Sequence, residues 1–354
     1  MQHSYPIKVK EVRRETLDCV SISFDIPDDL KEIFKFKAGQ YINIIKTVRG
    51  EELHRSYSLC VSPLEKDYRV AVKRVEGGSF SNYANTELKA GELLELMPPN
   101  GRFTLNLNEN HQKTYLFIAT GSGITPILSL VTNILEVEKS SKICLLYGNS
   151  SSDKIIFLNQ ILNLKNLYLD RLQLNFILSQ ELVEEECFQG RINAQKLKSF
   201  DGKIIHLSDV DEVFICGPES MILDIKSSLI ESGFSESKIH FELFGTEIKQ
   251  SLKPLTAKEI GKHAKIKLKT DGRTAEFDLE YGSISILEAA LNRKINLPFA
   301  CKGGVCCTCK ARLIEGEVEM LKNYGLEQDE IKAGYILTCQ AFPKSSKITV
   351  DYDQ

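Results

Sequence analysis

The first third of the chain alternates apolar and polar residues over short stretches, which is the pattern of half-buried β-strands. Turn residues such as Pro27-Asp28-Asp29 and the cluster Met97–Gly101 separate these stretches. The predicted strands are residues 5–15, 19–26, 40–48, 55–61 and 68–75. Many short strands at this spacing favour a barrel or a sandwich, and we predict an antiparallel β-barrel over residues 1–106.

From about residue 110 the pattern changes to apolar strands that alternate with segments of helical periodicity. The predicted strands are residues 114–120, 142–148, 172–179 and 212–217. After the first of them, apolar residues from Ile127 to Ile134 recur at helical spacing. This alternation predicts a parallel sheet with crossover helices, an α/β domain over residues 107–246.

The last part of the chain begins after a polar stretch without periodicity, residues 247–262, which we interpret as a linker. Residues 265–269 and 275–280 then alternate on either side of Asp271-Gly272, which predicts a β-hairpin. Ser285 and Glu288 have the spacing of a helix capping box. We therefore expect a third, α+β domain over residues 263–354.

Composition and charge narrow the functional classes. The chain has 354 residues with 45 Lys and Arg against 48 Asp and Glu, a formal charge of −3, which disfavours binding to nucleic acid or to membrane surfaces. No apolar run approaches the roughly 20 residues of a membrane-spanning helix, and the first residues lack the apolar segment of a signal peptide. We expect a cytoplasmic protein with several domains.

Four of the ten cysteines have the spacing of metal ligands. Cys301, Cys306 and Cys309 follow a C-x4-C-x2-C pattern, and Cys339 stands further along the chain. This is the plant-type 2Fe–2S pattern, in which a glycine-rich loop can point its backbone N–H groups at the sulfurs. Cys307 does not fit the spacing and is predicted not to be a ligand. The alternative is structural zinc, which usually has two C-x2-C pairs, whereas only one exists here.

Two motifs in the barrel region suit a flavin nucleotide. They are Arg55-Ser56-Tyr57-Ser58, within a predicted strand, and Gly77-Gly78-Ser79-Phe80-Ser81, after another. A guanidinium pairs with phosphate oxygens, an aromatic ring packs on a planar cofactor, and glycines allow a phosphate to approach the backbone. Taken alone, the first motif is usually a solvated strand face, and the second is equally well a hairpin turn.

Two motifs in the α/β region suit a dinucleotide. They are Gly121-Ser122-Gly123-Ile124-Thr125-Pro126, after the first strand, and Cys216-Gly217-Pro218, after a later one. We expect Pro126 at the first helical position, with a pyrophosphate against the helix N-terminus. The first string is not the G-x-G-x-x-G fingerprint, and a glycine loop after a strand is often only a tight turn. A lone buried cysteine such as Cys216 is normally inert packing.

Together these motifs resemble the ferredoxin–NADP reductase family, fused here to a C-terminal plant-type ferredoxin of the β-grasp fold. The resemblance implies FAD, with Arg55 on its pyrophosphate, Tyr57 stacked on the isoalloxazine and Ser58 near N5. It also implies that residues 77–81 face the flavin phosphates. Residues 216–218 would border the nicotinamide, and Phe244, in the string Phe241-Glu242-Leu243-Phe244, would lie near the flavin.

The resemblance leaves the choice of nicotinamide nucleotide open. Close relatives carry an arginine in a G-N-R-[ST] string that suits the 2′-phosphate of NADPH, whereas this chain has Gly148-Asn149-Ser150-Ser151. Ser150, Ser151 and Lys154 could still hold a phosphate, and Asp153 is the acidic residue in this segment. We favour NADPH, with NADH as the alternative.

Longer strings, among them residues 316–341, resemble the reductase components of phenylacetyl-CoA epoxidases, and reductases of steroid hydroxylases share much of the pattern. The resemblance implies that electrons pass from NAD(P)H through FAD and the cluster, one at a time, to a di-iron oxygenase. No side chain is expected to act as a general acid or base. A reductase of another oxygenase and a free-standing diaphorase are the alternatives. An acidic stretch comprises Glu315, Glu317, Glu319, Glu327, Asp329 and Glu330. One hypothesis is that it docks the partner at the ferredoxin domain; the alternative is an ordinary solvated face.

Overall fold

The structure is a computed structural model that describes residues 4–244 and 261–354. Apart from residues 261 and 262, the predicted linker lies outside the described residues. The chain divides into two compact units, one composed chiefly of residues 4–244 and the other of the segment after it. In the described parts of the chain, no helix is both long and apolar enough to cross a bilayer.

The first sheet is six-stranded, in the order β4-β3-β6-β1-β2-β5. Its strands are β1 (Tyr5–Thr16), β2 (Cys19–Asp25), β3 (Tyr41–Val48), β4 (Glu51–Ser58), β5 (Arg69–Lys73) and β6 (Leu93–Leu96). A bridge between Leu59 and Val70 joins the chain after β4 to β5, so the two edges of the sheet meet and close it into a barrel. This confirms the predicted antiparallel barrel, whose interior is an apolar cluster that includes Ile7 and Ile22.

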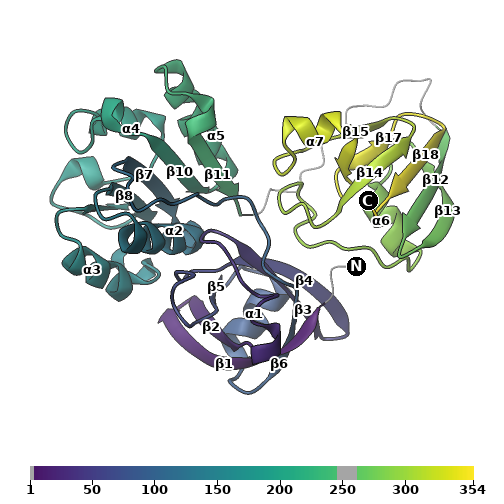
Figure 1. Cartoon of the computed structure of the whole chain (residues 1–354), viewed down its shortest axis with the longest axis horizontal. Coiled ribbons are helices and arrows are strands. Elements are labelled where there is room, and N and C mark those ends of the chain that lie inside the picture. The colour runs from purple at the N-terminus through teal and green to yellow at the C-terminus, as the bar shows by residue number, and fades with distance from the viewer. Residues whose placement is uncertain (1–3, 245–260) are drawn as a thin grey trace. The chain divides into compact units, whose positions relative to one another are not determined.

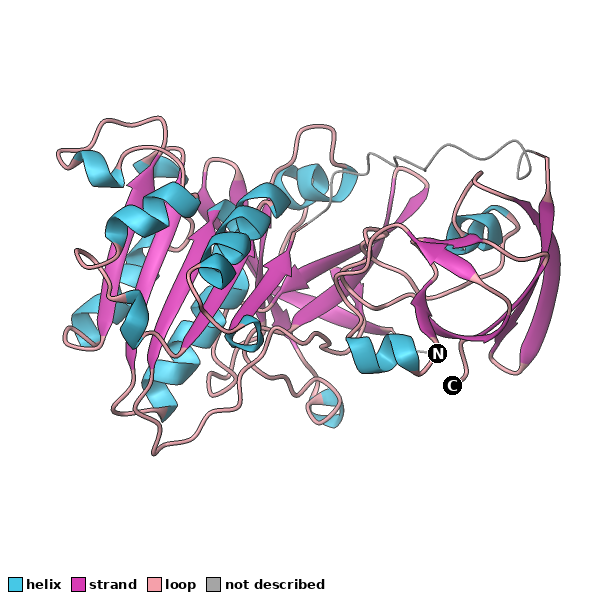
Figure 2. Ribbon diagram, turned by 90° about the horizontal axis from the view of Figure 1, so that it is seen from above, coloured by secondary structure: helices cyan, strands magenta, loops and turns pink. Residues whose placement is uncertain are grey.

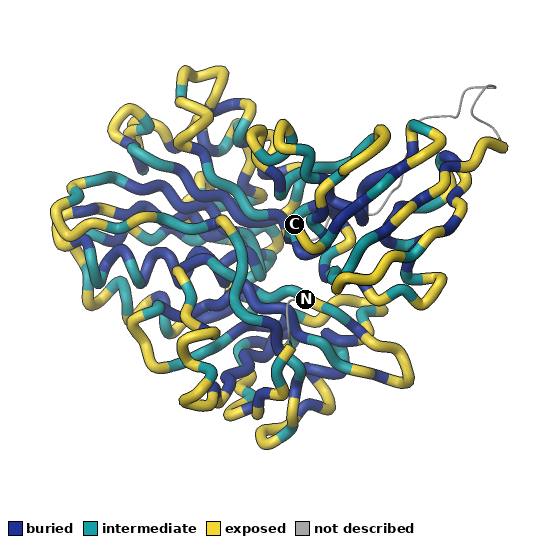
Figure 3. The backbone as a smooth tube through the Cα atoms, turned by 45° about the vertical axis from the view of Figure 1, so that its right-hand side comes forward, coloured by how far each residue is buried: buried dark blue, intermediate teal, exposed yellow. Residues whose placement is uncertain are grey.

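The second sheet is five-stranded and parallel, in the order β11-β10-β7-β8-β9 (Figure 1). Its strands are β7 (Thr114–Thr120), β8 (Lys142–Asn149), β9 (Leu172–Leu178), β10 (Glu212–Gly217) and β11 (Ile239–Leu243). Figure 2 shows helices on both of its faces; they are α2 (Ile124–Val137), α3 (Leu158–Leu167), α4 (Ala194–Phe200) and α5 (Glu219–Glu231). Both faces are therefore covered, and strands β7, β8 and β10 are buried except at their ends. Figure 3 draws the buried parts of the chain in dark blue.

The strand order of this parallel sheet determines where a ligand can bind. The chain runs outward from β7 to β8 and β9, and then returns to the other side of β7 for β10 and β11. The order therefore reverses between β7 and β10, and open α/β sheets bind ligands outside the carboxyl ends of the strands at this point. The string Gly121–Pro126 follows β7, and Cys216–Pro218 spans the carboxyl end of β10.

The C-terminal unit contains a five-stranded sheet in the order β13-β12-β18-β14-β16 and a separate β15–β17 pair. Its strands are β12 (His263–Thr270), β13 (Arg273–Glu280), β14 (Lys310–Glu315), β15 (Val318–Met320), β16 (Tyr335–Leu337), β17 (Ala341–Pro343) and β18 (Lys347–Asp351). Its helices are α6 (Ile286–Asn292) and α7 (Gln328–Lys332). The predicted hairpin turns at Asp271-Gly272, both with positive φ, and the Ser285 hydroxyl caps α6 by accepting the Glu288 N–H.

Two local features differ from the sequence-based expectations. Helix α2 begins at Ile124 after a 3-10 turn at Gly121–Gly123, so the expected first helical position of Pro126 is wrong by two residues. Proline is still tolerated there because no N–H in the first turn has an intrahelical acceptor. In addition, Gly78 is the N-cap of a helix that periodicity did not predict, α1 (Ser79–Thr86).

Candidate functional site

The two glycine strings of the α/β domain meet at the switch point. A Cβ on Gly123 would lie 2.3 Å from the backbone oxygen of Cys216, and a Cβ on Gly217 would lie 2.3 Å from Thr120 Oγ1. Gly121 has a φ of +52°, which a side chain would strain. Only glycine allows the ends of β7 and β10 to approach this closely, which leaves the first turn of α2 at the carboxyl edge of the sheet.

The same edge fits a pyrophosphate. Thr120 Oγ1 is buried and has no hydrogen-bond partner within the described residues. Lys73 Nζ, at the end of β5, lies 3.8 Å from the position of a Cβ on Gly121. Asp18 pairs with both Lys73 (3.9 Å) and Lys154 (3.8 Å), so two cations lie near one another beside the loop. Lys73 was not predicted from the sequence, because it ends a barrel strand and does not lie in any nucleotide-binding motif.

On strand β4, the predicted flavin motif places its residues in different environments. Arg55 is exposed, and its guanidinium donates to the His54 carbonyl (2.8 Å). The Tyr57 ring lies 5.6 Å from the ring of Phe80, which brings the two predicted flavin-binding motifs together. Ser58 is buried at the end of the strand.

Helix α1 begins where the second flavin motif was predicted. Gly78 is its N-cap, and a Cβ on Gly78 would lie 2.5 Å from Ser81 Oγ. The Ser81 hydroxyl accepts from the Val75 N–H (3.1 Å), so it shapes the loop, whereas Ser79 is exposed. The free N–H groups of the first helical turn and the Ser79 hydroxyl form a cradle that fits a phosphate.

A half-buried glutamate connects the barrel to the parallel sheet. The Ser58 hydroxyl donates to Glu242 Oε2 (3.0 Å), and Glu242 lies on β11. Burial raises the pKa of Glu242 to about 8, partly offset by the hydrogen bond from Ser58. Glu242 therefore holds a proton at neutral pH, and its strongly shifted pKa is typical of functional sites. Glu242 was not predicted from the sequence; within this string only Phe244, which is 37% exposed, was expected to lie near the flavin.

The predicted metal ligands lie together in the C-terminal unit. Cys301 Sγ accepts the backbone N–H groups of Gly303 (3.3 Å) and Cys306 (3.4 Å), and the Cys301 N–H donates to Cys306 Sγ (3.4 Å). The Cys306 side chain and these backbone donors lower the pKa of the Cys301 thiol to about 6 despite its burial. Thiolates are the ligands that iron–sulfur clusters require, so this loop fits a cluster.

The thiols form two pairs. The Cys301 side chain hydrogen-bonds to that of Cys306, and the Cys309 side chain to that of Cys339. In the described part of the chain, no three side chains are arranged as ligands of one single ion. A cluster of two irons takes two cysteines on each iron, and the two pairs fit this division.

Cys307 packs against the loop backbone at Val305 and Gly325. Its φ is +51°, and its sulfur lies 2.4 Å from the position that a Cβ on Gly325 would occupy. Nearby, Lys302 has a φ of +52°, and a Cβ on Gly304 would lie 2.6 Å from the Lys322 carbonyl oxygen. The loop is thus tightly folded, with backbone strain of the kind that often accompanies functional sites.

Three protein families match successive parts of the chain. The oxidoreductase FAD-binding domain family matches residues 6–105, the oxidoreductase NAD-binding domain family residues 117–227, and the 2Fe-2S iron-sulfur cluster binding domain family residues 268–344.

Full-length relatives are similar over nearly the whole chain. One of the subunits of the Escherichia coli 1,2-phenylacetyl-CoA epoxidase is 41% identical over 99% of this chain and 98% of its own length. The ferredoxin reductase component of a Mycolicibacterium smegmatis 3-ketosteroid-9-alpha-monooxygenase is 30% identical over 99% of this chain and 98% of its own. The solved structure of a phthalate dioxygenase reductase has a TM-score of 0.60 and covers 98% of both chains at 22% identity, which supports the fold. The chain belongs to the family of oxygenase reductase components that combine FAD-binding, NAD-binding and 2Fe-2S domains in one polypeptide.

Proposed function

We propose that the chain is the cytoplasmic reductase of a phenylacetyl-CoA epoxidase, which passes electrons from NAD(P)H through FAD and a 2Fe–2S cluster to a di-iron oxygenase. The observation that carries this proposal is the 41% identity, over 99% of the chain, to a component of such an epoxidase. When bound, FAD accepts two electrons together from a nicotinamide and releases them singly, which a one-electron cluster requires.

The residue assignments follow the three sites. We assign FAD to Arg55, Ser56, Tyr57, Ser58, Gly77, Gly78, Ser79, Phe80 and Ser81, with Phe244 at its edge. We assign the nicotinamide nucleotide to Gly121, Ser122, Gly123, Thr125, Pro126, Ser150, Ser151, Cys216, Gly217 and Pro218. We assign the cluster to Cys301, Cys306, Cys309 and Cys339. The cradles described above support these assignments by their backbone donors and cations.

In this proposal the chain's own residues position the bound groups. Ser58 holds the protonated Glu242 at the end of the flavin strand, and the buried Cys216 pairs with Glu242 between β10 and β11.

A reconstitution experiment tests the epoxidase assignment. The FAD- and cluster-loaded chain is mixed with NAD(P)H and the oxygenase component of either a phenylacetyl-CoA epoxidase or a 3-ketosteroid hydroxylase. We expect product only with the epoxidase component. Turnover with the steroid oxygenase alone would assign the chain to that class instead, and turnover with neither would favour a free-standing diaphorase.

The role of the cluster is tested by two adjacent cysteines. Cys306→Ser should abolish electron delivery to the oxygenase, because a cluster ligand is lost, but should leave the reduction of ferricyanide by NAD(P)H intact. Cys307→Ser is the matched control and should retain iron, acid-labile sulfide and both activities. If Cys306→Ser still feeds the oxygenase at the wild-type rate, the cluster is not on the electron path.

We also propose that the oxygenase docks transiently at the ferredoxin domain, although much of the predicted acidic stretch has partners within the domain. Glu319 pairs with Lys344 (3.0 Å) and Glu330 with Lys310 (3.1 Å). Glu327 caps α7, and Glu315 accepts from Thr349 (3.2 Å). Glu317 and Asp329 are exposed and are the residues on which the docking proposal now rests.

Charge reversal tests this docking. Glu317→Lys combined with Asp329→Lys should slow electron delivery to the oxygenase at low salt, because charge complementarity speeds transient encounters. NAD(P)H-to-ferricyanide turnover should not change. The matched control is Asp278→Lys with Glu280→Lys, on β13 at the opposite edge of the sheet. Equal losses in both double variants would contradict docking at the acidic stretch.

A further inference from the structure

Two buried serine hydroxyls join the barrel to the helix that follows the nucleotide loop. Ser129 on α2 donates to the Val61 carbonyl (2.5 Å), and Ser62 donates to Glu136 Oε2 on the same helix. Both serines are 0% exposed. Val61 and Ser62 stand three and four residues after Ser58, the last residue of the flavin strand β4. We call these two hydrogen bonds the serine latch.

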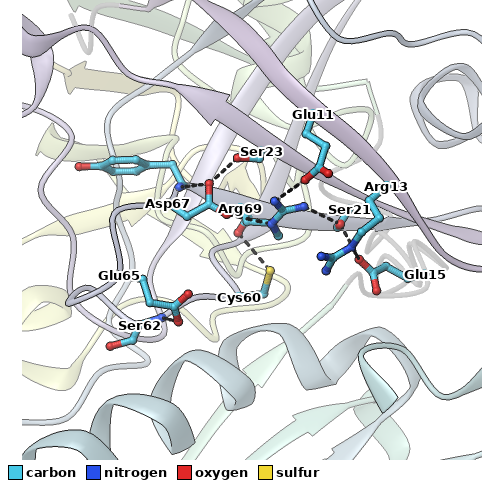
Figure 4. A network of polar contacts seen from close by, with 11 residues as sticks. Glu11, Arg13, Glu15, Ser21, Ser23, Cys60, Ser62, Glu65, Asp67 and Arg69 are labelled. Carbon is cyan, nitrogen blue, oxygen red and sulfur yellow. Dashed lines mark hydrogen bonds and ion pairs between the residues drawn. The ribbon is translucent and has the colours of Figure 1, made fainter. Parts of the chain in front are cut away.

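On the barrel side, the segment that carries the latch is itself held firmly (Figure 4). Cys60 donates to the Arg69 carbonyl through both its backbone N–H (2.9 Å) and its thiol (3.2 Å). The Arg69 guanidinium is bound by Glu11 (2.6 Å), Asp67 (2.9 Å) and Ser21 (3.0 Å), which lie along the barrel wall. A shift of this segment would therefore break both Cys60 hydrogen bonds to Arg69, whose side chain is in turn fixed to the barrel wall by charged hydrogen bonds.

Ser62 also makes a second hydrogen bond, to Glu65. The Ser62 N–H donates to Glu65 Oε1 (3.0 Å), so one serine bridges the carboxylates of Glu65 and Glu136. Burial raises the pKa of Glu65, and the Glu136 carboxylate raises it further. A substitution that removes the Ser62 hydroxyl takes the donor away from Glu136, although the backbone N–H still serves Glu65, and this loss disfavours the present contact.

We propose that Ser62 and Ser129 are positioning residues that set the approach of the nicotinamide to the flavin. The inference rests on the proposed function. The flavin is assigned to the end of β4 and the dinucleotide to the start of α2, and the latch connects the continuations of these two elements. Hydride transfer needs reacting atoms about 3–3.5 Å apart, and a displacement of about 1 Å can reduce the rate roughly 100-fold.

The test measures flavin reduction directly. The FAD-loaded Ser129→Ala variant is mixed anaerobically with NADH or NADPH, whichever the wild type oxidises, and flavin absorbance is followed by stopped flow. We expect the limiting rate of reduction to fall about tenfold or more, while nucleotide Kd and FAD content stay within about twofold, because the approach is altered and not the binding. With 4-deuterated nucleotide the isotope effect should persist, which shows that hydride transfer is still the step measured.

Ser141→Ala is the matched control. Ser141 is also 0% exposed, but its hydroxyl bonds Glu138 (2.7 Å) and the His111 carbonyl (3.2 Å) within the α/β domain. This variant should lose a comparable part of its unfolding free energy and keep the wild-type limiting rate. The proposal is overturned if both variants slow equally, or if Ser129→Ala changes only Kd.

A second pair of variants keeps the test decisive if Ser129→Ala does not fold. Glu136→Gln retains an oxygen acceptor for the Ser62 hydroxyl, so the flavin of this variant should be reduced at nearly the wild-type rate. Glu136→Leu removes the acceptor, so its flavin should be reduced slowly. Equal rates for the two variants would refute the latch. If the wild type itself is not reduced by either nucleotide, the proposed function fails rather than the latch.

Discussion

The Glu242 side chain makes the stability of the folded chain depend on pH. Its pKa is raised from 4.5 to about 8 by burial. Between these two values the folded state binds more protons at this group than the unfolded state, so the group lowers the stability as the pH rises through that window. This is the opposite of an ion-paired carboxylate, because among the described residues burial and the Ser58 hydroxyl, and no cation, determine the pKa of Glu242.

We expect Glu242→Gln to remove this pH dependence. Between pH 5 and pH 8.5 the wild type should lose about 2 to 4 kcal/mol of unfolding free energy relative to the variant, since each pKa unit corresponds to about 1.4 kcal/mol. Urea unfolding at the two pH values measures the difference. Glu184→Gln, at an exposed position, is the control and should show none. A wild-type stability that runs parallel to that of Glu242→Gln would contradict the burial argument.

A side chain at Gly123 is expected to reduce both stability and nucleotide binding. In Gly123→Ala the new Cβ would lie 2.3 Å from the Cys216 carbonyl oxygen, a backbone atom that cannot rotate away. We expect a loss of about 1–3 kcal/mol in stability and weaker binding of NAD(P)+, because the start of α2 must move. Gly202→Ala, which has open space and a φ of +74°, should cost about 1 kcal/mol and leave nucleotide binding unchanged. Thermal unfolding and titration calorimetry measure both quantities.

At the scale of elements, the segment after β8 bears on nucleotide choice. Lys154, one of the residues expected to hold a 2′-phosphate, pairs with Asp18 beside the pyrophosphate loop. The Ser152 backbone N–H (2.6 Å) and hydroxyl (2.9 Å) both donate to Glu181, which adds a carboxylate at the ends of β8 and β9. These contacts favour NADH over the NADPH that the sequence analysis favoured.

We expect one substitution in the same segment to shift the nucleotide preference toward NADPH. Ser150→Arg places a guanidinium where the resemblance implies the 2′-phosphate, so kcat/KM for NADPH relative to NADH should rise about tenfold or more, equivalent to about 1.4 kcal/mol. Steady-state ferricyanide reduction with each nucleotide measures the ratio. Ser208→Arg, exposed in another loop, should leave the ratio unchanged. A wild type that already prefers NADPH would show that the carboxylate does not reject the phosphate.

At the scale of the whole molecule, the three domains make the chain an NAD(P)H-dependent iron–sulfur flavoprotein reductase. Anaerobic titration with dithionite should therefore consume about three electron equivalents per chain, two for FAD and one for the cluster. Absorbance at the flavin and cluster bands measures the uptake. Cys306→Ser should consume about two. A wild type that also stops at two and contains zinc would contradict the cluster.

The patterns along the chain predicted the elements well where neighbours in sequence are also neighbours in space. The alternation in β12 and β13, the turn at Asp271-Gly272 and the Ser285 cap depend on contacts within a few residues. Local rules were insufficient at Pro126 and at helix α1, because a 3-10 turn and a loop bonded through Ser81 determine where those helices begin. Loop geometry of this kind has no periodicity to detect.

Chemistry that is carried within a single loop could be predicted from the residues alone. The spacing of Cys301, Cys306 and Cys309 indicates a cluster because these ligands lie close together in one loop. The contacts that cross between sheets became visible only in the folded chain, such as Ser58 with Glu242, which are 184 residues apart, and Ser129 with Val61, which are 68 apart. Such pairs carry no local signature, since burial and proximity arise only when the barrel and the parallel sheet pack together.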